Sequence, residues 1–303
     1  MQPPGPDTLT QAAGSVLQLH PLRCAGLALR GLYLAHELRA QGDPAQPFVY
    51  TNFIASLDGR ISEVGPGGRR RVPPATANAR DWRLYLELLA QADVVLTTAR
   101  HLRAVAAGRQ PPPGLREAAA EGLIAWRVAR GLTPEPAIAV VSEQLQIPVR
   151  DVLRRCGGPL HLLTHRGVAD TRAQALHDEG ADVQRIGASP ILSAAEVLRA
   201  LTAHGYRNIY SIAGPRVLHT LLAGGALDRL YLTIAQVILG GGGDTLMPDV
   251  ALDTPAGFTL EALYLDPHAP PGVGQLLMTL HNSASAARRE MAWPRPRSSE
   301  RGA

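Results

Sequence analysis

The chain has 303 residues, of which 46% are hydrophobic, 4% aromatic and 18% charged. This length and composition exclude a chain that is disordered throughout, and two cysteines are too few for a disulfide framework or a cysteine-built zinc site. The net charge of +4 comes from arginines spread along the chain, with no lysine and few aromatic residues, so we expect no nucleic-acid partner.

Residues 1–46 start with a polar, proline-rich stretch that lacks a basic start and an apolar segment. We therefore expect no secretory signal and no membrane span, and a cytoplasmic protein whose cysteines are reduced. Leucines spaced along residues 25–41 predict one helix, which ends at a break beginning with Gly42. This part of the chain is expected to be a helical extension.

From Pro47 onward, short apolar runs alternate with helical patterns, the rhythm of strand, crossover and parallel strand. Because most runs are apolar on both faces, they predict a buried parallel sheet. The predicted strands are residues 48–54, 94–97, 137–141, 160–164, 183–186 and 208–212. The predicted helices are residues 76–91, residues 170–180, and one that opens at the capping box Ser193-Ala-Ala-Glu196 and closes at Gly205.

After Asp228 the pattern changes, because predicted strands at 229–235, 259–266 and 274–281 follow one another without a helix. Consecutive strands of this kind pair antiparallel. Residues 283–303 are rich in Arg, Ser, Pro and Ala and are expected to be a disordered tail. The sequence thus predicts one α/β domain over residues 47–282, between the extension 1–46 and this tail.

Two strand ends carry the polar residues that point to chemistry. The first ends in Ser56-Leu-Asp-Gly-Arg60, where a hydroxyl and a carboxylate can orient a polar base or sugar, and Gly59 lets a backbone approach closely. Asn52 shares a sheet face with Ile54 and offers one more polar contact, or is a structural asparagine. Asp-Gly is also an ordinary turn dipeptide, so a plain turn remains the alternative.

The second strand end runs into Ala213-Gly-Pro-Arg-Val217. Pro215 suits the first turn of a helix, and Gly214 leaves room for phosphate oxygens to meet backbone amides at the positive helix end. This segment is our candidate for binding the diphosphate of a dinucleotide.

The two strand ends, with residues 79–99, 140–148 and 225–242, resemble the reductase domain of the bacterial bifunctional deaminase-reductase of riboflavin biosynthesis. The resemblance covers roughly residues 47–282. It implies a three-layer α/β/α dihydrofolate reductase-like fold, a mostly parallel sheet with antiparallel C-terminal strands, and a homodimer. No Pro-Cys-x-x-Cys zinc motif is present, so residues 1–46 cannot be the companion deaminase and the reductase stands alone.

The resemblance further implies an NADPH-dependent 5-amino-6-(5-phosphoribosylamino)uracil reductase that transfers hydride to C1 of the opened ribose. Asp58 is then the catalytic candidate that orients the amino-pyrimidine. The substrate-binding candidates are Asn52, Ser56, Gly59, Arg60 and Arg80, with Arg60 and Arg80 meeting carbonyl or phosphate oxygens. The cofactor-binding candidates are Thr97, Thr98, Ala99, Ser142, Thr164, Arg166, Ala213, Gly214, Pro215, Arg216 and Val217.

Thr164 and Arg166 favour NADPH over NADH, because a hydroxyl and a guanidinium suit the 2′-phosphate; an exposed basic loop is the alternative. The chain departs from the family at Arg60, where lysine is usual, and at Ile212, where relatives carry glutamate. Two other functions therefore stay open: reduction of another pterin-like or carbonyl substrate, and a catalytically silent nucleotide-binding or scaffold protein. The histidines show no convincing metal spacing, so no metal is predicted.

Overall fold

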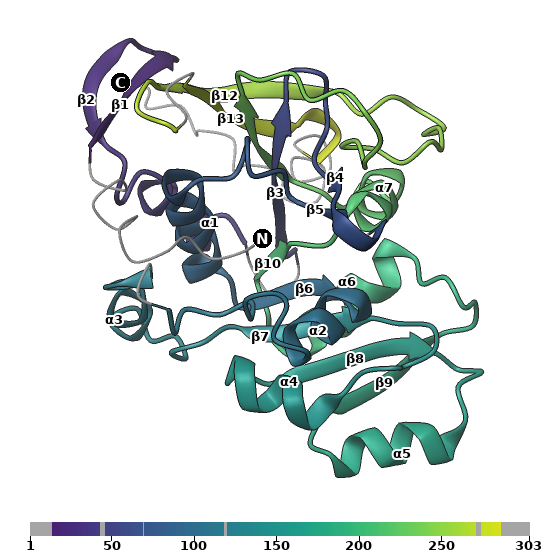
Figure 1. Ribbon diagram of the computed structural model, residues 1–303. Coiled ribbons are helices and arrows are strands. Elements are labelled where there is room, and N and C mark those ends of the chain that lie inside the picture. Colours follow the sequence, from purple (N-terminus) through teal and green to yellow (C-terminus); the bar gives the residue numbers. More distant parts are fainter. Residues whose placement is uncertain (1–13, 43–45, 69, 118–119, 271–273, 286–303) are drawn as a thin grey trace, which may run out of the picture.

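The structure is a computed structural model and describes residues 14–42, 46–68, 70–117, 120–270 and 274–285 (Figure 1). Its centre is an 11-stranded sheet with the strand order β2-β1-β12-β13-β11-β3-β10-β6-β7-β8-β9. The strands are β1 (Ser15–His20), β2 (Cys24–Ala28), β3 (Phe48–Ser56), β6 (Val94–Thr98), β7 (Ala137–Val141), β8 (Leu160–His165), β9 (Asp182–Gly187), β10 (Asn208–Ser211), β11 (Arg229–Ala235), β12 (Phe258–Asp266) and β13 (Gln275–Asn282). A separate hairpin joins β4 (Glu63–Val64) and β5 (Arg70–Arg71).

The strands from β11 to β9 in this order pair in parallel, and those from β11 to β2 pair antiparallel. The mixed sheet and the antiparallel C-terminal strands are therefore as predicted. β13 lies between β11 and β12, so the last two strands form a hairpin whose second strand returns to β11. Each strand predicted from the sequence is present within two residues of its expected bounds.

Helices cover both faces of the sheet. They are α1 (Ala79–Gln91), α2 (Ala99–Ala106), α3 (Leu123–Val128), α4 (Val149–Cys156), α5 (Asp170–Asp178), α6 (Ala194–Ala203) and α7 (Pro215–Ala223). Figure 1 places α1 and α7 on opposite sides of β3. Because strand residues alternate between faces, one face packs in the cluster around Tyr50, Tyr210 and α1, and the other packs against α6 and α7.

The helix ends follow from local chemistry. The side chain of Asn78 caps α1 by accepting hydrogen bonds from the amides of Arg80 and Asp81. α6 opens with the predicted capping box of Ser193 and Glu196, and α7 opens with Pro215 at its first position. α2, α3 and α4 were not predicted, because with 8, 6 and 8 residues they are too short to show a clear period.

The predicted helix over residues 25–41 is wrong. This segment forms β2 and two short 3-10 turns, η2 (Leu34–His36) and η3 (Leu38–Ala40). Gly26 and Gly31 have positive φ angles of 76° and 87°, and Glu37 is also left-handed at φ 44°, so the chain reverses where the leucine pattern predicts a helix.

Side chains of α1 hold the segment against the domain. Glu87 accepts hydrogen bonds from the amides of Gly31 (2.6 Å) and Tyr33 (3.1 Å), and Gln91 accepts one from the amide of Leu38 (2.9 Å). Tyr33 and Leu38 are buried in the core cluster around α1. The N-terminal segment is therefore part of the core, since tertiary contacts override the local leucine pattern.

The predicted disordered tail lies mostly outside the described residues, which end at Ser285. Among the described residues, no helix has the length and apolar character needed to cross a bilayer.

Candidate functional site

The predicted site segments meet at one edge of the sheet. The strands β3, β10, β6, β7 and β8 are neighbours and run parallel, so their carboxyl ends open on the same side. The chain returns from β9 to β10 in the middle of the sheet, and its helices change from the α1 face to the α6 and α7 face. Ligands of open α/β sheets bind at such a switch point.

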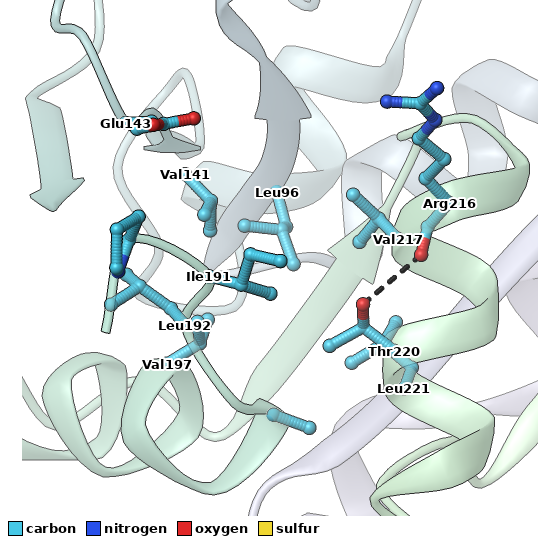
Figure 2. A pocket seen from close by; sticks show the side chains of 12 residues that line it. Leu96, Val141, Glu143, Ile191, Leu192, Val197, Arg216, Val217, Thr220 and Leu221 are labelled. Atoms are coloured by element: carbon cyan, nitrogen blue, oxygen red, sulfur yellow. Dashed lines mark hydrogen bonds between the residues drawn. The ribbon is translucent and has the colours of Figure 1, made fainter. Parts of the chain in front are cut away.

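A pocket of about 220 Å³ opens at this edge, between the ends of β6 and β7, the loop before α6 and the first turns of α7 (Figure 2). Its lining is mainly apolar, and its walls include Leu96, Val141, Ile191, Val197 and Val217. Glu143 and Arg216 also line it, and Figure 2 shows them on opposite sides. The volume suits one flat ring system better than a whole dinucleotide.

The N-terminus of α7 forms one wall of this pocket, and no side chain in the described part of the chain caps it. Gly214 is the N-cap residue, with φ −74° and ψ −171°, which any residue can adopt. A Cβ atom at this position would meet no atom of the described residues within 4 Å, so these residues leave the space beside the helix end open. The uncapped amides and helix dipole make this a place where an anion is stabilised.

The turn from Ser56 to Arg60 is tied to a glycine-rich loop. The Ser56 hydroxyl donates to Asp58 (2.5 Å), and the Asp58 carboxylate accepts hydrogen bonds from the amides of Leu239 (3.1 Å) and Gly240 (2.8 Å). The hydrogen bonds from Ser56 and Leu239 lower the pKa of Asp58 to about 2. Asp58 is thus ionised at neutral pH and holds the loop, a role that sequence analysis missed although the run of glycines at 240–243 was visible.

The two candidate arginines lie in different surroundings. Arg60 is half-buried and donates from Nη1 to the carbonyl oxygen of Gly243 (3.2 Å). Arg80 is 1% exposed, and its Nε lies 2.7 Å from Oδ2 of Asp266. The predicted contact of Arg80 with substrate is therefore corrected: its charge is buried and paired with a carboxylate of β12.

The hydroxyls of Thr97 and Thr164 do not reach the pocket. These residues alternate along their strands with Leu96 and Leu163, which face α6 and α7, so the two threonines point to the opposite face. Each is 1% exposed, and neither hydroxyl has a hydrogen-bond partner among the residues that the structure describes. The predicted bond from the Thr164 hydroxyl to a phosphate is corrected for this reason.

Other predicted cofactor residues use their side chains locally. Thr98 caps α2 by accepting a hydrogen bond from the amide of His101 (3.2 Å), and Ser142 accepts one from the amide of Leu145 (3.0 Å). Ala99 begins α2 and packs against the apolar cluster of α2 and α4, and Ala213 is buried, so neither side chain offers a polar contact. Arg166 is exposed just beyond β8 and stays available to a ligand.

Two predicted residues lie on the α1 face. Asn52 accepts a 2.5 Å hydrogen bond from the hydroxyl of Tyr210, and Ile212 packs against the apolar cluster around α1. On this face the structure also reveals Asp81, which is 4% exposed and accepts a hydrogen bond from Thr233 (2.8 Å). Burial raises the pKa of Asp81 to about 6. No local sequence pattern reveals this pair, because its members lie 152 positions apart.

Comparison with known proteins agrees with this architecture. The family model described as the RibD C-terminal domain matches residues 47–266. A pyrimidine reductase-like protein from Corynebacterium diphtheriae aligns at 22% identity and a TM-score of 0.60, covering 78% of this chain and 92% of that protein. Acinetobacter baumannii RibD aligns at 15% identity and a TM-score of 0.56, covering 78% of this chain and 58% of that one.

The riboflavin biosynthesis reductase of Saccharomyces cerevisiae aligns at 14% identity and a TM-score of 0.51, covering 82% of this chain and 99% of that protein. No curated protein is similar enough to count as a match. At these identities the solved structures show the fold alone, which is the predicted α/β architecture of a mostly parallel sheet with antiparallel C-terminal strands.

Proposed function

The chain belongs to the RibD C-terminal domain family, and on this premise we propose that it is an NADPH-dependent reductase of a phosphorylated aminopyrimidine. The observation that carries the proposal is the uncapped N-terminus of α7 beside an apolar pocket at the switch point of the sheet. A helix end of this kind fits a diphosphate, and the apolar walls fit a flat ring. The solved structures named as reductases support assignment to the oxidoreductases.

The residues around the pocket have distinct roles in this proposal. The amides at the start of α7 and the side chain of Arg216 hold the diphosphate, and Val141, Ile191 and Val217 enclose a ring of the cofactor. Arg166 supplies the positive charge that binds the 2′-phosphate of NADPH. Glu143, in the pocket wall, repels that phosphate. When bound, the cofactor supplies the hydride for reduction at C1 of the opened ribose.

The substrate lies beyond the end of β3 in this proposal, where Ser56, Gly59 and Arg60 form the turn held by the glycine-rich loop. Asp58 acts as a positioning residue, and its exposed carboxylate can also meet the aminopyrimidine. Asn52 contributes from the α1 face. A cytoplasmic homodimer, implied by the family resemblance, belongs to the same proposal.

The test uses the purified chain, NADPH and 5-amino-6-(5-phosphoribosylamino)uracil. We expect NADPH binding, followed as a change in nicotinamide fluorescence, and oxidation of NADPH that depends on the pyrimidine. Binding without oxidation would reject this substrate. Absence of binding would reject the reductase and favour a silent scaffold protein.

A second substrate class has one observation in its favour. Ile212 packs into the apolar cluster around α1, at the position where the family resemblance implies a glutamate. A substrate with fewer polar groups, such as another carbonyl or pterin-like compound, suits this surface better. Oxidation of NADPH with such a compound, but not with the phosphoribosylaminouracil, would select this alternative.

A further inference from the structure

Two histidines and an aspartate meet at the opposite edge of the sheet from the pocket. His161 is the second residue of β8 and lies directly opposite Asp182, the first residue of β9. His204 is the C-cap residue of α6, which ends at the same edge. Three separate elements thus bring these side chains together.

The ligand atoms are close enough to share one ion. Nδ1 of His161 lies 2.8 Å and Nε2 of His204 lies 3.2 Å from the same oxygen, Oδ2 of Asp182. All three atoms lie within 4.8 Å of one another. Nitrogen and carboxylate ligands bind Zn²⁺ at about 2.0–2.2 Å, so in a tetrahedron they stand about 3.3 Å apart. The two nitrogen–oxygen distances lie within about 0.5 Å of that spacing. An ion would displace the side-chain amide of Gln184, which lies 2.6 Å from Oδ2 of Asp182 and also contacts Nε2 of His204.

Tyr206 orients the ring of His161. The hydroxyl of Tyr206 lies 2.8 Å from Nε2 and fixes the ring so that Nδ1 faces Asp182, the outer contact that metal-binding histidines need.

The three side chains can be reached from solvent. The side chain of His161 is 6% exposed, whereas those of Asp182 and His204 are 43% and 32% exposed, so an ion can enter from solvent and keep a water molecule. We propose that His161, Asp182 and His204 bind a divalent transition-metal ion of the zinc class, with water as the fourth ligand. The ion joins β8, β9 and the end of α6, away from the proposed cofactor pocket.

The experiment uses untagged full-length protein treated with a chelator and then dialysed. Titration with Zn²⁺ by calorimetry is expected to show one ion per chain, and Co²⁺ to give the absorption bands of a tetrahedral nitrogen and oxygen site. His204→Ala and Asp182→Asn are expected to weaken Zn²⁺ binding by at least about tenfold. The matched control is His177→Ala, which removes an exposed histidine of α5 and leaves binding unchanged.

Circular dichroism establishes that each variant is folded, and Asp182→Asn keeps the size of the side chain. Zn²⁺ is also expected to raise the melting temperature of the parent and of His177→Ala, but not of His204→Ala. The proposal is overturned if the parent binds no ion, or if both ligand variants bind Zn²⁺ as tightly as the parent does. Activity with NADPH takes no part in this test, so its outcome is separate from that of the proposed function.

Discussion

The carboxylate of Asp58 accepts a 2.8 Å hydrogen bond from the backbone amide of Gly240, a residue 182 positions further along the chain. This bond joins the turn at the end of β3 to the glycine-rich loop after β11. Because β3 and β11 are parallel neighbours, both segments emerge at the same edge of the sheet. The hydrogen bond from the Ser56 hydroxyl, followed by that from the Leu239 amide, lowers the pKa of this exposed acid to about 2, and the Gly240 bond adds a smaller contribution in the same direction.

Replacing Asp58 by Asn is expected to weaken the hydrogen bonds that hold this loop, while the side chain still fills the same space. Asn keeps the size of the side chain but loses the charge and one of the two acceptor oxygens. A loop shifted by about 1 Å is expected to lower kcat by roughly tenfold to a hundredfold. The dissociation constant for NADPH should change little, since the pocket lies between α6 and α7.

Steady-state kinetics and fluorescence titration measure the two quantities separately. Asp249→Asn is the matched control, because Asp249 is an exposed acid in the same connection between β11 and β12. An unchanged kcat in Asp58→Asn would remove Asp58 from the mechanism.

Buried Asp81 makes stability depend on pH. Its pKa is about 6 in the folded protein and about 3.8 in the unfolded chain, so the folded state binds the proton more tightly between these values. Stability therefore falls as the pH rises from about 4 to about 6. A shift of about two pKa units corresponds to about 3 kcal/mol as an upper estimate.

Asp81→Asn should remove this loss, because the amide oxygen can still accept from Thr233 and carries no charge. Urea unfolding at pH 5 and pH 7.5 is the measurement, and the stability of the variant relative to the parent should be greater at the higher pH. Burial also lowers the pKa of His36 to about 4. Because His36 is present in both proteins, its contribution cancels when the stability of the parent is subtracted from that of the variant. If the difference in stability between variant and parent is equal at both pH values, ionisation of buried Asp81 does not destabilise the folded protein.

The choice between NADPH and NADH should depend on two charges at the carboxyl edge. Arg166→Gln removes the cation proposed to meet the 2′-phosphate, and is expected to weaken NADPH binding by about tenfold while NADH binding stays the same. Glu143→Gln removes an opposing anion from the pocket wall and should shift the preference towards NADPH.

The measured quantity is the ratio of the two dissociation constants. Arg150→Gln, which changes an exposed arginine of α4, serves as the control. If neither Arg166→Gln nor Glu143→Gln alters the ratio, the 2′-phosphate lies elsewhere.

The sequence predicts the strands well because a parallel sheet needs short runs that are apolar on both faces, and Val94 to Leu96 or Ile138 to Val140 form such runs. It also predicts the start of α7, since Gly214-Pro215 is a local signal. It does not predict β1, which pairs with β12 across most of the chain length. The turn after β2 depends on the hydrogen bond from the Gly31 amide to the Glu87 carboxylate, which no local sequence pattern reveals.

The site is less predictable than the fold, because its side chains contact residues far away in the sequence. Arg80 matches the family pattern, but its partner Asp266 lies 186 positions away and buries the charge. Ile191 lies in a loop without a motif, yet it lines the pocket. Strand alternation places Thr97 and Thr164 on the face opposite the pocket, and it becomes informative only once the positions of the helices are known.

Two substitutions of Gly214 test whether a dinucleotide diphosphate binds at the N-terminus of α7. A side chain at Gly214 meets open space, and both Asp and Asn are favoured N-cap residues, so both variants should be at least as stable as the parent. They differ by one negative charge at the proposed diphosphate position. The decisive measurement is the dissociation constant for NADPH in Gly214→Asp relative to Gly214→Asn. A diphosphate at this helix end requires binding at least about tenfold weaker in the Asp variant. Equal affinities in two stable variants would show that the diphosphate binds elsewhere.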